Sequence, residues 1–256
     1  MTLPFRPPLF GRFADSIRSL PPLARYGHEH LCTATFRLYS DRRIELFYAP
    51  FDFVNKLAKV AVIGITPGFQ QMEIAFRAAR TALVSGKTDV EASRQAKAAA
   101  AFAGRMRRNL ISMLGDIRLH RWLGLPDPAS LFSGHLSLVH TTSAIRYPVF
   151  VHGANYTGHA PPILRHPVLR AIVFEVLCPE LAEVPGALLI PLGKAVEECL
   201  CALVSAGLLG RERCLLGFPH PGGGNGHRIG QFELNMDRLK TEAAGWFRRA
   251  AGAASA

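Results

Sequence analysis

Several features that would place a chain in a common class are missing from this sequence. Its five cysteines form no C-x-x-C pair and no framework spacing, which argues against a disulfide-stapled secreted domain. The most apolar stretch, 188–209, is interrupted by Lys194, Glu197 and Glu198, which argues against a membrane span. The proline-broken N-terminus lacks the apolar core of a signal peptide. We therefore expect a cytoplasmic protein with reduced core thiols.

Two nucleotide-binding signatures are missing as well, G-x-G-x-x-G and G-x-x-x-x-G-K-[ST], which argues against an α/β enzyme with a nucleotide cofactor. Acidic residues are few: 19 stand against 30 lysines and arginines, and the net charge is +11. Such a surplus is typical of a protein with an anionic partner such as nucleic acid. Arginines crowd one stretch in particular, at Arg105, Arg107, Arg108, Arg118 and Arg121.

The chain of 256 residues, with 49% hydrophobic residues, suits a single domain over 1–256. Apolar runs predict four buried strands, at 59–64, 136–142, 187–192 and 214–218. Helical patterns lie between and after them, at 70–83, 90–114, 164–176, 194–206 and about 232–250. This alternation predicts an α/β fold, a three-layer α/β/α sandwich with a central, mainly parallel four-stranded sheet.

Segments outside this pattern are expected to contribute little regular structure. Residues 43–47 could add an edge strand, residues 1–40 are expected to be irregular, and residues 251–256 a frayed tail.

Unusual residues follow the predicted strands, where ligands collect in parallel sheets because the loops converge there. The first strand is followed by G-I-T-P-G-F, 64–69, whose glycines let the backbone approach a ligand. The second leads into H-T-T-S-A-I-R-Y-P-V-F, 140–150, with Asn155 farther on. The fourth is followed by G-F-P-H-P-G-G-G-N-G-H-R, 217–228.

The G-x-x-P-G turn and the H-P-small-small loop resemble the two signature motifs of the uracil-DNA glycosylase superfamily. The segment after the second strand resembles the family's middle motif, and F-A-G at 102–104 resembles the F-x-G of its thermostable iron–sulfur branch. I-P-L-G-K-A, 190–195, is similar to the family's third strand and following helix. The resemblance covers roughly residues 45–230 and implies a monofunctional, monomeric DNA glycosylase that flips uracil and hydrolyses its glycosidic bond, starting base excision repair.

The resemblance also implies residue roles. His220 takes the place of the histidine that stabilises the departing uracil anion, because a preorganised N–H donor in a dry pocket stabilises developing charge. Thr66 lies in the turn that activates water. The implied base-binding residues are Gly64, Ile65, Pro67, Gly68, Phe69, Phe102, Thr142, Ser143 and Asn155. The implied contacts to DNA phosphates are Pro221, Gly222, Gly223, Asn225, Gly226, His227 and Arg228.

Thr66 departs from the family, most of whose members carry Asp, Asn or Glu there, and a hydroxyl cannot act as a general base near neutral pH. Either an acid elsewhere activates water, with Glu73 and Asp52 nearest in sequence, or the bond breaks dissociatively and water attack is easy. We favour the dissociative route. The same departure leaves open a non-enzymatic protein that recognises uracil or abasic DNA without cleaving.

The pocket and the loop depart too. Thr141, Thr142 and Ser143 stand where relatives often use Asn to read uracil, so we expect a broader range of bases, such as uracil plus hypoxanthine. The loop offers glycines and Asn225 in place of a bulky wedge, so we expect a preference for poorly paired bases or single strands. Either Phe69 or Phe102 could stack on the base.

No metal or other cofactor is expected. The iron–sulfur branch uses four cysteine ligands, and the thiols here lie at other places. His28-Glu29-His30 has no further spaced ligands, so we interpret these as surface histidines.

Overall fold

The computed structural model describes residues 3–254, and the chain clusters into two compact units of mixed α/β structure. Unit 1 comprises Met1–Phe53, Ile65–Ala103 and Ser143–Leu177. Unit 2 comprises Val54–Gly64, Gly104–Thr142 and Cys178–Ala256. The α/β class is thus confirmed, while the assignment of 1–256 to a single domain stays a prediction.

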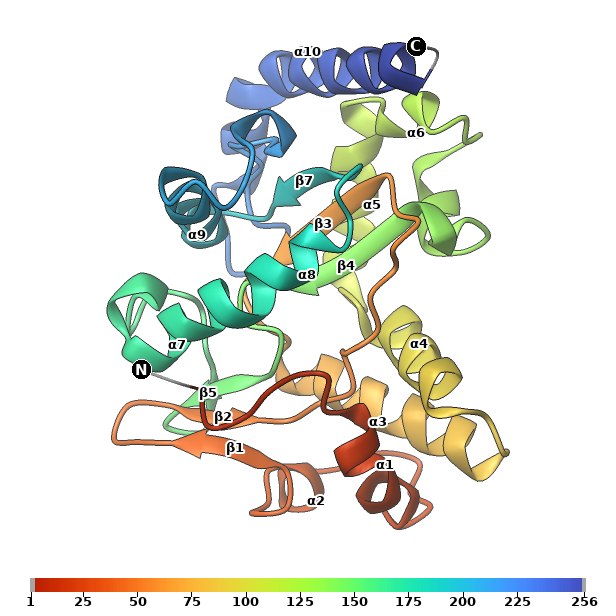
Figure 1. Cartoon of the computed structure of the whole chain (residues 1–256), viewed down its shortest axis with the longest axis vertical. Helices are drawn as coiled ribbons and strands as arrows, with labels where there is room; N and C mark the ends of the chain where they lie inside the picture. Colours follow the sequence, from red (N-terminus) through yellow and green to blue (C-terminus); the bar gives the residue numbers. More distant parts are fainter. Residues whose placement is uncertain (1–2, 255–256) are drawn as a thin grey trace. The chain divides into compact units, whose positions relative to one another are not determined.

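A small sheet of largely buried strands forms the centre of unit 2. Its strands are β3 (Val60–Gly64), β4 (Val139–Ser143) and β7 (Leu188–Pro191), in the order β4-β3-β7. β3 and β7 pair in parallel, with Val60 opposite Leu188, and Figure 1 draws all three arrows in the same direction. Every residue of β3 and β7 is buried, as expected for parallel strands covered on both faces.

The fourth predicted strand, 214–218, is extended chain beside β7 and not a full strand. It makes one parallel bridge, between Cys214 and Leu189, and the amide of Leu215 donates to the carbonyl of Leu189 at 2.8 Å. Gly217 then turns the backbone with a φ of 87°, which ends the strand geometry. This sheet therefore has three strands and not the predicted four.

Helices complete unit 2. They are α5 (Arg105–Asp116), α6 (Leu119–Trp122), α8 (Cys178–Ala182), α9 (Lys194–Ser205) and α10 (Arg228–Ala254), with short 3-10 turns η1 (Pro128–Phe132), η2 (Leu136–Leu138) and η5 (Arg211–Arg213). α9 packs on β7, and α10 packs on α6. Trp122 of α6 and Phe247 of α10 stack at an interplanar angle of 3° and so connect these two helices. No helix within residues 3–254 is long and apolar enough to cross a membrane.

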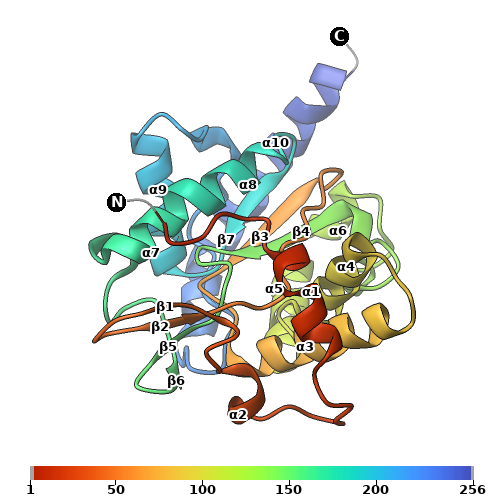
Figure 2. The same cartoon turned by 60° about the horizontal axis from the view of Figure 1, so that its bottom comes forward.

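Unit 1 contains a separate, antiparallel sheet (Figure 2). Its strands are β1 (Arg37–Ser40), β2 (Glu45–Phe47), β5 (Val149–Val151) and β6 (Ala154–Asn155), in the order β1-β2-β5-β6. Its helices are α1 (Phe10–Arg18), α2 (His28–Leu31), α3 (Phe69–Val84), α4 (Asp89–Ala100) and α7 (Pro167–Ile172), with a 3-10 turn η3 (Ile163–Arg165) and a π-helical turn η4 (Val173–Leu177). The strand predicted at 43–47 thus exists as β2, but it pairs in this second sheet.

Three other predicted segments differ from the structure. The helix predicted over 90–114 is divided into α4 and α5, because Phe102 and Gly104 adopt positive φ angles of 54° and 83°. The segment 1–40, expected to be irregular, contains α1, whose apolar residues recur at helical spacing and are buried. At the other end α10 continues through Ala254, and the rest of the predicted frayed tail lies outside the described residues.

A buried carboxylate organises the core of unit 1. Asp52 Oδ1 accepts hydrogen bonds from the Tyr147 hydroxyl at 2.8 Å and the Leu9 amide at 3.0 Å. Its Oδ2 accepts one from the Tyr48 hydroxyl at 3.0 Å. Burial, followed by the negative charge of Asp52, raises the pKa of both tyrosines well above the ordinary value, so both remain donors.

Asp52→Ala should lower the free energy of unfolding by about 3 kcal/mol, because it leaves buried donors without their shared acceptor. The measurement is urea unfolding followed by circular dichroism. Asp15→Ala is the control, since that side chain is 95% exposed, and it should change the value by less than about 0.5 kcal/mol. Equal effects of the two substitutions would contradict a structural role for Asp52.

Candidate functional site

The residues singled out in the sequence fall into two groups, one in each unit. The turn segment, residues 65–69, belongs to unit 1 together with Phe102, Ser143 and Asn155. The histidine loop, residues 219–228, belongs to unit 2. Gly64 and Thr142, at the ends of β3 and β4, also belong to unit 2.

Asn155 holds the start of α3. Its N-cap residue, Gly68, has no side chain to cap the helix, and Asn155 Oδ1 accepts the Phe69 amide at 2.8 Å instead. The fit is close, because a Cβ on Gly68 would lie 3.3 Å from the Asn155 carboxamide. The exposed Asn155 therefore uses its side-chain oxygen on the helix, and its side-chain N–H groups remain hydrogen-bond donors.

Thr66 anchors the turn segment to the middle motif. Its hydroxyl donates to the Tyr147 carbonyl at 2.9 Å, and the Ile65 carbonyl accepts the Ile145 amide at 2.9 Å. The Thr66 proton is thus engaged by the backbone, and the hydroxyl retains only lone pairs with which to orient a water molecule.

Both acids that could substitute for a turn carboxylate have structural partners. Glu73 is buried and accepts from Arg77 Nε at 2.9 Å and from the Tyr26 amide at 3.4 Å. Asp52 is shared by two tyrosine hydroxyls and a backbone amide. Neither carboxylate has the environment of a free general base.

Phe69 and Phe102, the two candidates for base stacking, have different surroundings. The imidazole of His28 stacks on Phe69 with ring centroids 3.6 Å apart and an interplanar angle of 10°. His28 is exposed, so this stack ends at the surface of unit 1, whereas Phe102 is buried with a φ of 54°. Such a backbone conformation is costly for an aromatic residue and is often found at functional sites.

Sequence reasoning missed the role of His28, because nothing in the sequence links it to Phe69. Among residues 3–254, no group of three or more His, Cys, Asp or Glu side chains could hold a metal ion. Within this range His28 packs as an aromatic ring beside the turn segment.

The ring of His220 is held in one tautomer. Its Nδ1 accepts the Gly222 amide at 3.1 Å, so a neutral ring carries its proton on Nε2. Burial lowers the pKa of His220 below the ordinary value and favours this neutral form. His220 is thereby a preorganised N–H donor.

Two glycines allow the backbone to approach His220. A Cβ on Gly222 would lie 2.7 Å from His220 Cε1, which would force the ring to move. Gly193, which follows β7, has a φ of 88°, and a Cβ there would lie 3.0 Å from His220 Cβ. The I-P-L-G-K-A segment therefore packs directly against the histidine.

Two asparagines hold the histidine loop from within unit 2. Asn109 of α5 donates its side-chain amide to the Pro221 carbonyl at 2.8 Å, a contact with no signal in the sequence. Asn225 donates to the His220 carbonyl at 3.3 Å and to Gln231 at 3.0 Å. Asn225, expected to contact phosphates, thus has its amide engaged inside the loop, while Gly223, Gly226 and His227 are exposed.

Thr142 carries a polar atom that lacks a partner. Its hydroxyl at the end of β4 is buried and has no hydrogen-bond partner within residues 3–254. Such orphaned groups mark places where a ligand or an ordered water completes the bonding. Gly64 lies at the corresponding end of β3, where the Leu192 amide donates to the Ile63 carbonyl at 2.9 Å.

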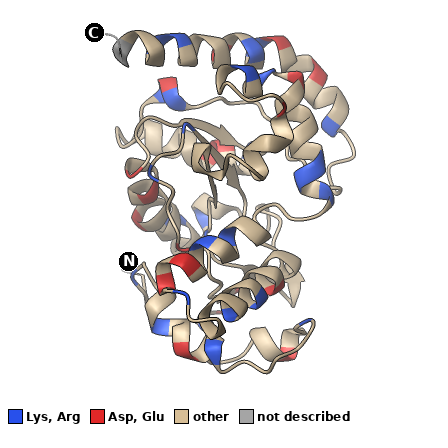
Figure 3. Ribbon diagram, turned by 90° about the vertical axis from the view of Figure 1, so that its right-hand side faces the viewer, with Lys and Arg blue, Asp and Glu red and all other residues tan. Residues whose placement is uncertain are grey.

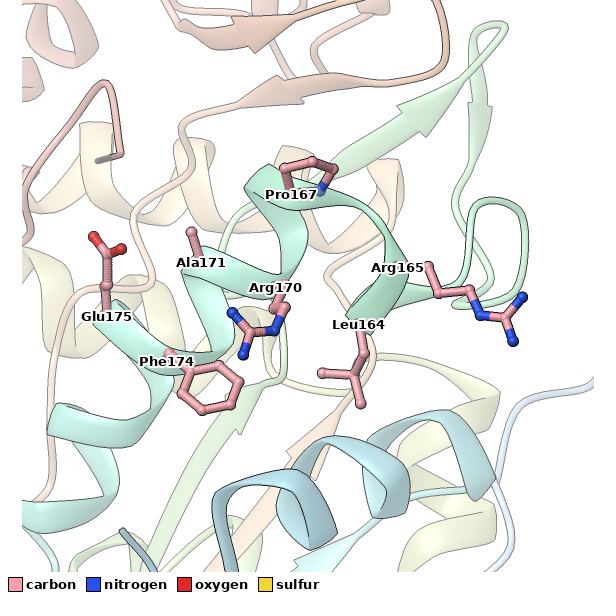
Figure 4. A pocket seen from close by; sticks show the side chains of 7 residues that line it. All are labelled: Leu164, Arg165, Pro167, Arg170, Ala171, Phe174 and Glu175. Atoms are coloured by element: carbon pink, nitrogen blue, oxygen red, sulfur yellow. The ribbon is translucent and has the colours of Figure 1, made fainter. Parts of the chain in front are cut away.

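A separate hollow of about 350 Å³ opens along α7 in unit 1 (Figure 4). The Arg170 guanidinium lies over the Phe174 ring at 4.5 Å, and Leu164 and Arg165 contribute to the wall. This hollow contains none of the residues singled out in the sequence, so it is distinct from both groups described above.

Gly222→Ala should displace the His220 ring and raise its pKa toward the ordinary value of about 6.5, because the ring moves toward water and loses its backbone donor. An NMR titration of the ring protons measures this pKa. Gly224→Ala is the control, since a Cβ there meets nothing within 4 Å. A titration of His220 that is the same in both variants would contradict the close packing.

Comparisons with known proteins identify a relative of this chain. No protein-family model matches it, and no solved structure matches it. It is 40% identical over 232 residues to the Bacillus subtilis (strain 168) protein named "Uncharacterized protein YoxB", with 90% of each chain covered. The chain therefore belongs to the same protein family as YoxB of Bacillus subtilis.

Proposed function

We propose that the protein is a monofunctional DNA glycosylase that excises uracil, and hypoxanthine as a second substrate, from DNA and so starts base excision repair. The proposal includes the uracil-DNA glycosylase-like sandwich and action as a monomer in the cytoplasm. The observation that carries it is the state of His220: Nδ1 is occupied by the Gly222 amide, and burial favours a neutral ring whose Nε2–H can donate.

His220 supplies what the difficult step of glycosidic hydrolysis requires. When the bond between the sugar and uracil breaks, the electron pair stays on the base, and negative charge builds on its O2. An N–H donor already fixed in place stabilises that charge without reorganisation during the reaction. The loop glycines matter to this step because they let the backbone fix the ring.

Water attack follows bond cleavage in this mechanism. The Thr66 hydroxyl donates to a carbonyl, and Asp52 and Glu73 have structural partners, so none of the three is a strong general base. Hydrolysis proceeds without such a base when the sugar cation forms before water attacks. Water then adds its oxygen to the anomeric carbon and releases a proton to solvent, and the uracil anion is protonated after it leaves. The Thr66 lone pairs orient this water.

The candidate base-reading groups suit more than one base. The orphaned Thr142 hydroxyl can donate or accept a hydrogen bond, and the exposed Asn155 offers amide donors. Carbonyl oxygens that accept such bonds are present in both uracil and hypoxanthine. A rotatable hydroxyl discriminates less sharply than a fixed amide, which is why we include the second base.

His220→Ala should reduce base excision by about 100-fold or more, because one preorganised donor is lost. The assay uses end-labelled oligonucleotides with a single uracil opposite G, opposite A, or unpaired, followed by alkali cleavage. His135→Ala, at an exposed histidine of unit 2, is the matched control and should retain activity. Equal activity of wild type and His220→Ala would refute the assignment.

Thr66→Val tests the route of water attack. The variant should lose less than about tenfold in rate, because the hydroxyl only orients water, and about 1 kcal/mol in stability, because the Tyr147 carbonyl loses its donor. Single-turnover excision and urea unfolding measure the two quantities. A loss of rate as large as that of His220→Ala would instead make Thr66 an essential part of water activation.

The alternative function is recognition of uracil or abasic DNA without cleavage. The engagement of Thr66, Asp52 and Glu73 favours it, because neither of the two carboxylates is free to activate water. A wild-type protein that binds uracil-containing DNA but yields no alkali-labile sites on uracil or hypoxanthine would support this alternative over the enzyme.

A further inference from the structure

The first turns of α5 lie against the histidine loop. Asn109 donates to the Pro221 carbonyl at 2.8 Å, and Met106 Cε would lie 3.6 Å from a Cβ on Gly222. Both contacts are within unit 2. The N-terminal end of α5 is therefore adjacent to the loop that holds His220.

This end of α5 is strongly basic. From residue 104 to 121 the chain has five arginines and a single acidic residue, Asp116. Arg105 and Arg108 are exposed and three residues apart, which places them on neighbouring positions of the helix surface. Arg105 lies one turn before Asn109, on the face that meets the loop.

Arg105 and Arg108 also differ from several other basic residues in having no acidic partner. Within residues 3–254 neither arginine forms an ion pair, whereas Arg238 of α10 pairs with Glu242 at 2.8 Å. Figure 3 shows both kinds of charge on the ribbon, lysine and arginine in blue and aspartate and glutamate in red. An exposed guanidinium without a carboxylate suits a phosphate, which it can bind through two N–H groups.

The loop next to these arginines is open to a backbone approach. Gly223, Gly224 and Gly226 are exposed, and a Cβ on any of them would meet nothing within 4 Å. Such a bare stretch of peptide lets a ligand come within hydrogen-bond distance of the main chain. Arg228 follows at the first residue of α10 and adds a cation at the other end of the loop.

We propose that Arg105 and Arg108 bind consecutive phosphodiester groups of a DNA strand that lies across the histidine loop. The inference rests on the proposed function, because it takes DNA as the partner of this loop. It extends the phosphate contacts from the loop to α5, and it leaves out Arg118 and Arg121, which lie beyond the far end of the helix. The 12 residues of α5 separate the two ends by about 18 Å.

Salt dependence of DNA binding tests the proposal. Each phosphate contact contributes about 0.9 to the slope of log K against log salt, so R105Q/R108Q should lower the slope by about 2. R118Q/R121Q removes the same charge from the same stretch and should leave the slope within about 0.5 of the wild type. Fluorescence anisotropy with a labelled uracil-containing duplex, in the His220→Ala background, measures binding without turnover.

The outcomes separate this inference from the proposed function. A lower slope for R105Q/R108Q alone supports the phosphate contacts, even if the wild type excises no base. Equal slopes for both double variants overturn the inference, even if the wild type is an active glycosylase, and so does the absence of DNA binding by the parent protein. Thermal unfolding checks that both double variants are folded. The variant Arg105→Lys keeps the charge, so it should keep most of the slope of log K against log salt that R105Q/R108Q loses.

Discussion

Parallel backbone pairing between β3 and β7 is the constraint on which the arrangement of unit 2 depends. The two strands are in register from Val60 and Leu188 onward, and the bond from the Leu192 amide to the Ile63 carbonyl continues the pairing to the end of both. Gly193 comes directly after Leu192, and its backbone packs against His220, which follows the extended segment 214–218. The position of His220 is thus a consequence of strand register, transmitted through one glycine.

The strands that carry this pairing were predictable because their signal is local. β3 and β7 are short apolar runs that end at glycine or proline, and the helices α3 and α9 have clear apolar periodicity. The antiparallel sheet of unit 1 was predicted only at β2. Its other strands were not predictable in the same way, because they have only two to four residues and pair across distant segments. Burial of the aromatic residues around them decides the pairing, and burial is a property of the folded chain.

The break between α4 and α5 is a second feature that local sequence preference did not predict. The alanine-rich sequence favours one continuous helix, and Phe102 has no intrinsic preference for the left-handed conformation that it adopts. Packing of the aromatic ring overrides the local preference there. The F-x-G resemblance was the only sign in the sequence that this position differs from an ordinary helical residue.

The candidate site residues also divide into those that the sequence indicates and those that only the fold brings together. The glycines and the histidine of the loop could be singled out as candidates from their types and order, since few structural needs combine His, Pro and several glycines. The partners that give those residues their states could not: Asn109, Gly193 and His28 reach them only through the fold. The same holds for the acids, because sequence distance made Asp52 and Glu73 candidates, whereas their hydrogen bonds give them structural roles.

The cap that Asn155 provides for α3 links the stability of a helix to the exposed surface of the turn before it. A change of this residue alters both at once, because the same carboxamide satisfies the helix terminus and faces the solvent beside Phe69. The exposed surface at position 155 therefore cannot change without a cost to the start of α3. Thr142 lacks this constraint, because no other described group requires its hydroxyl, so a substitution there leaves the described hydrogen bonds intact.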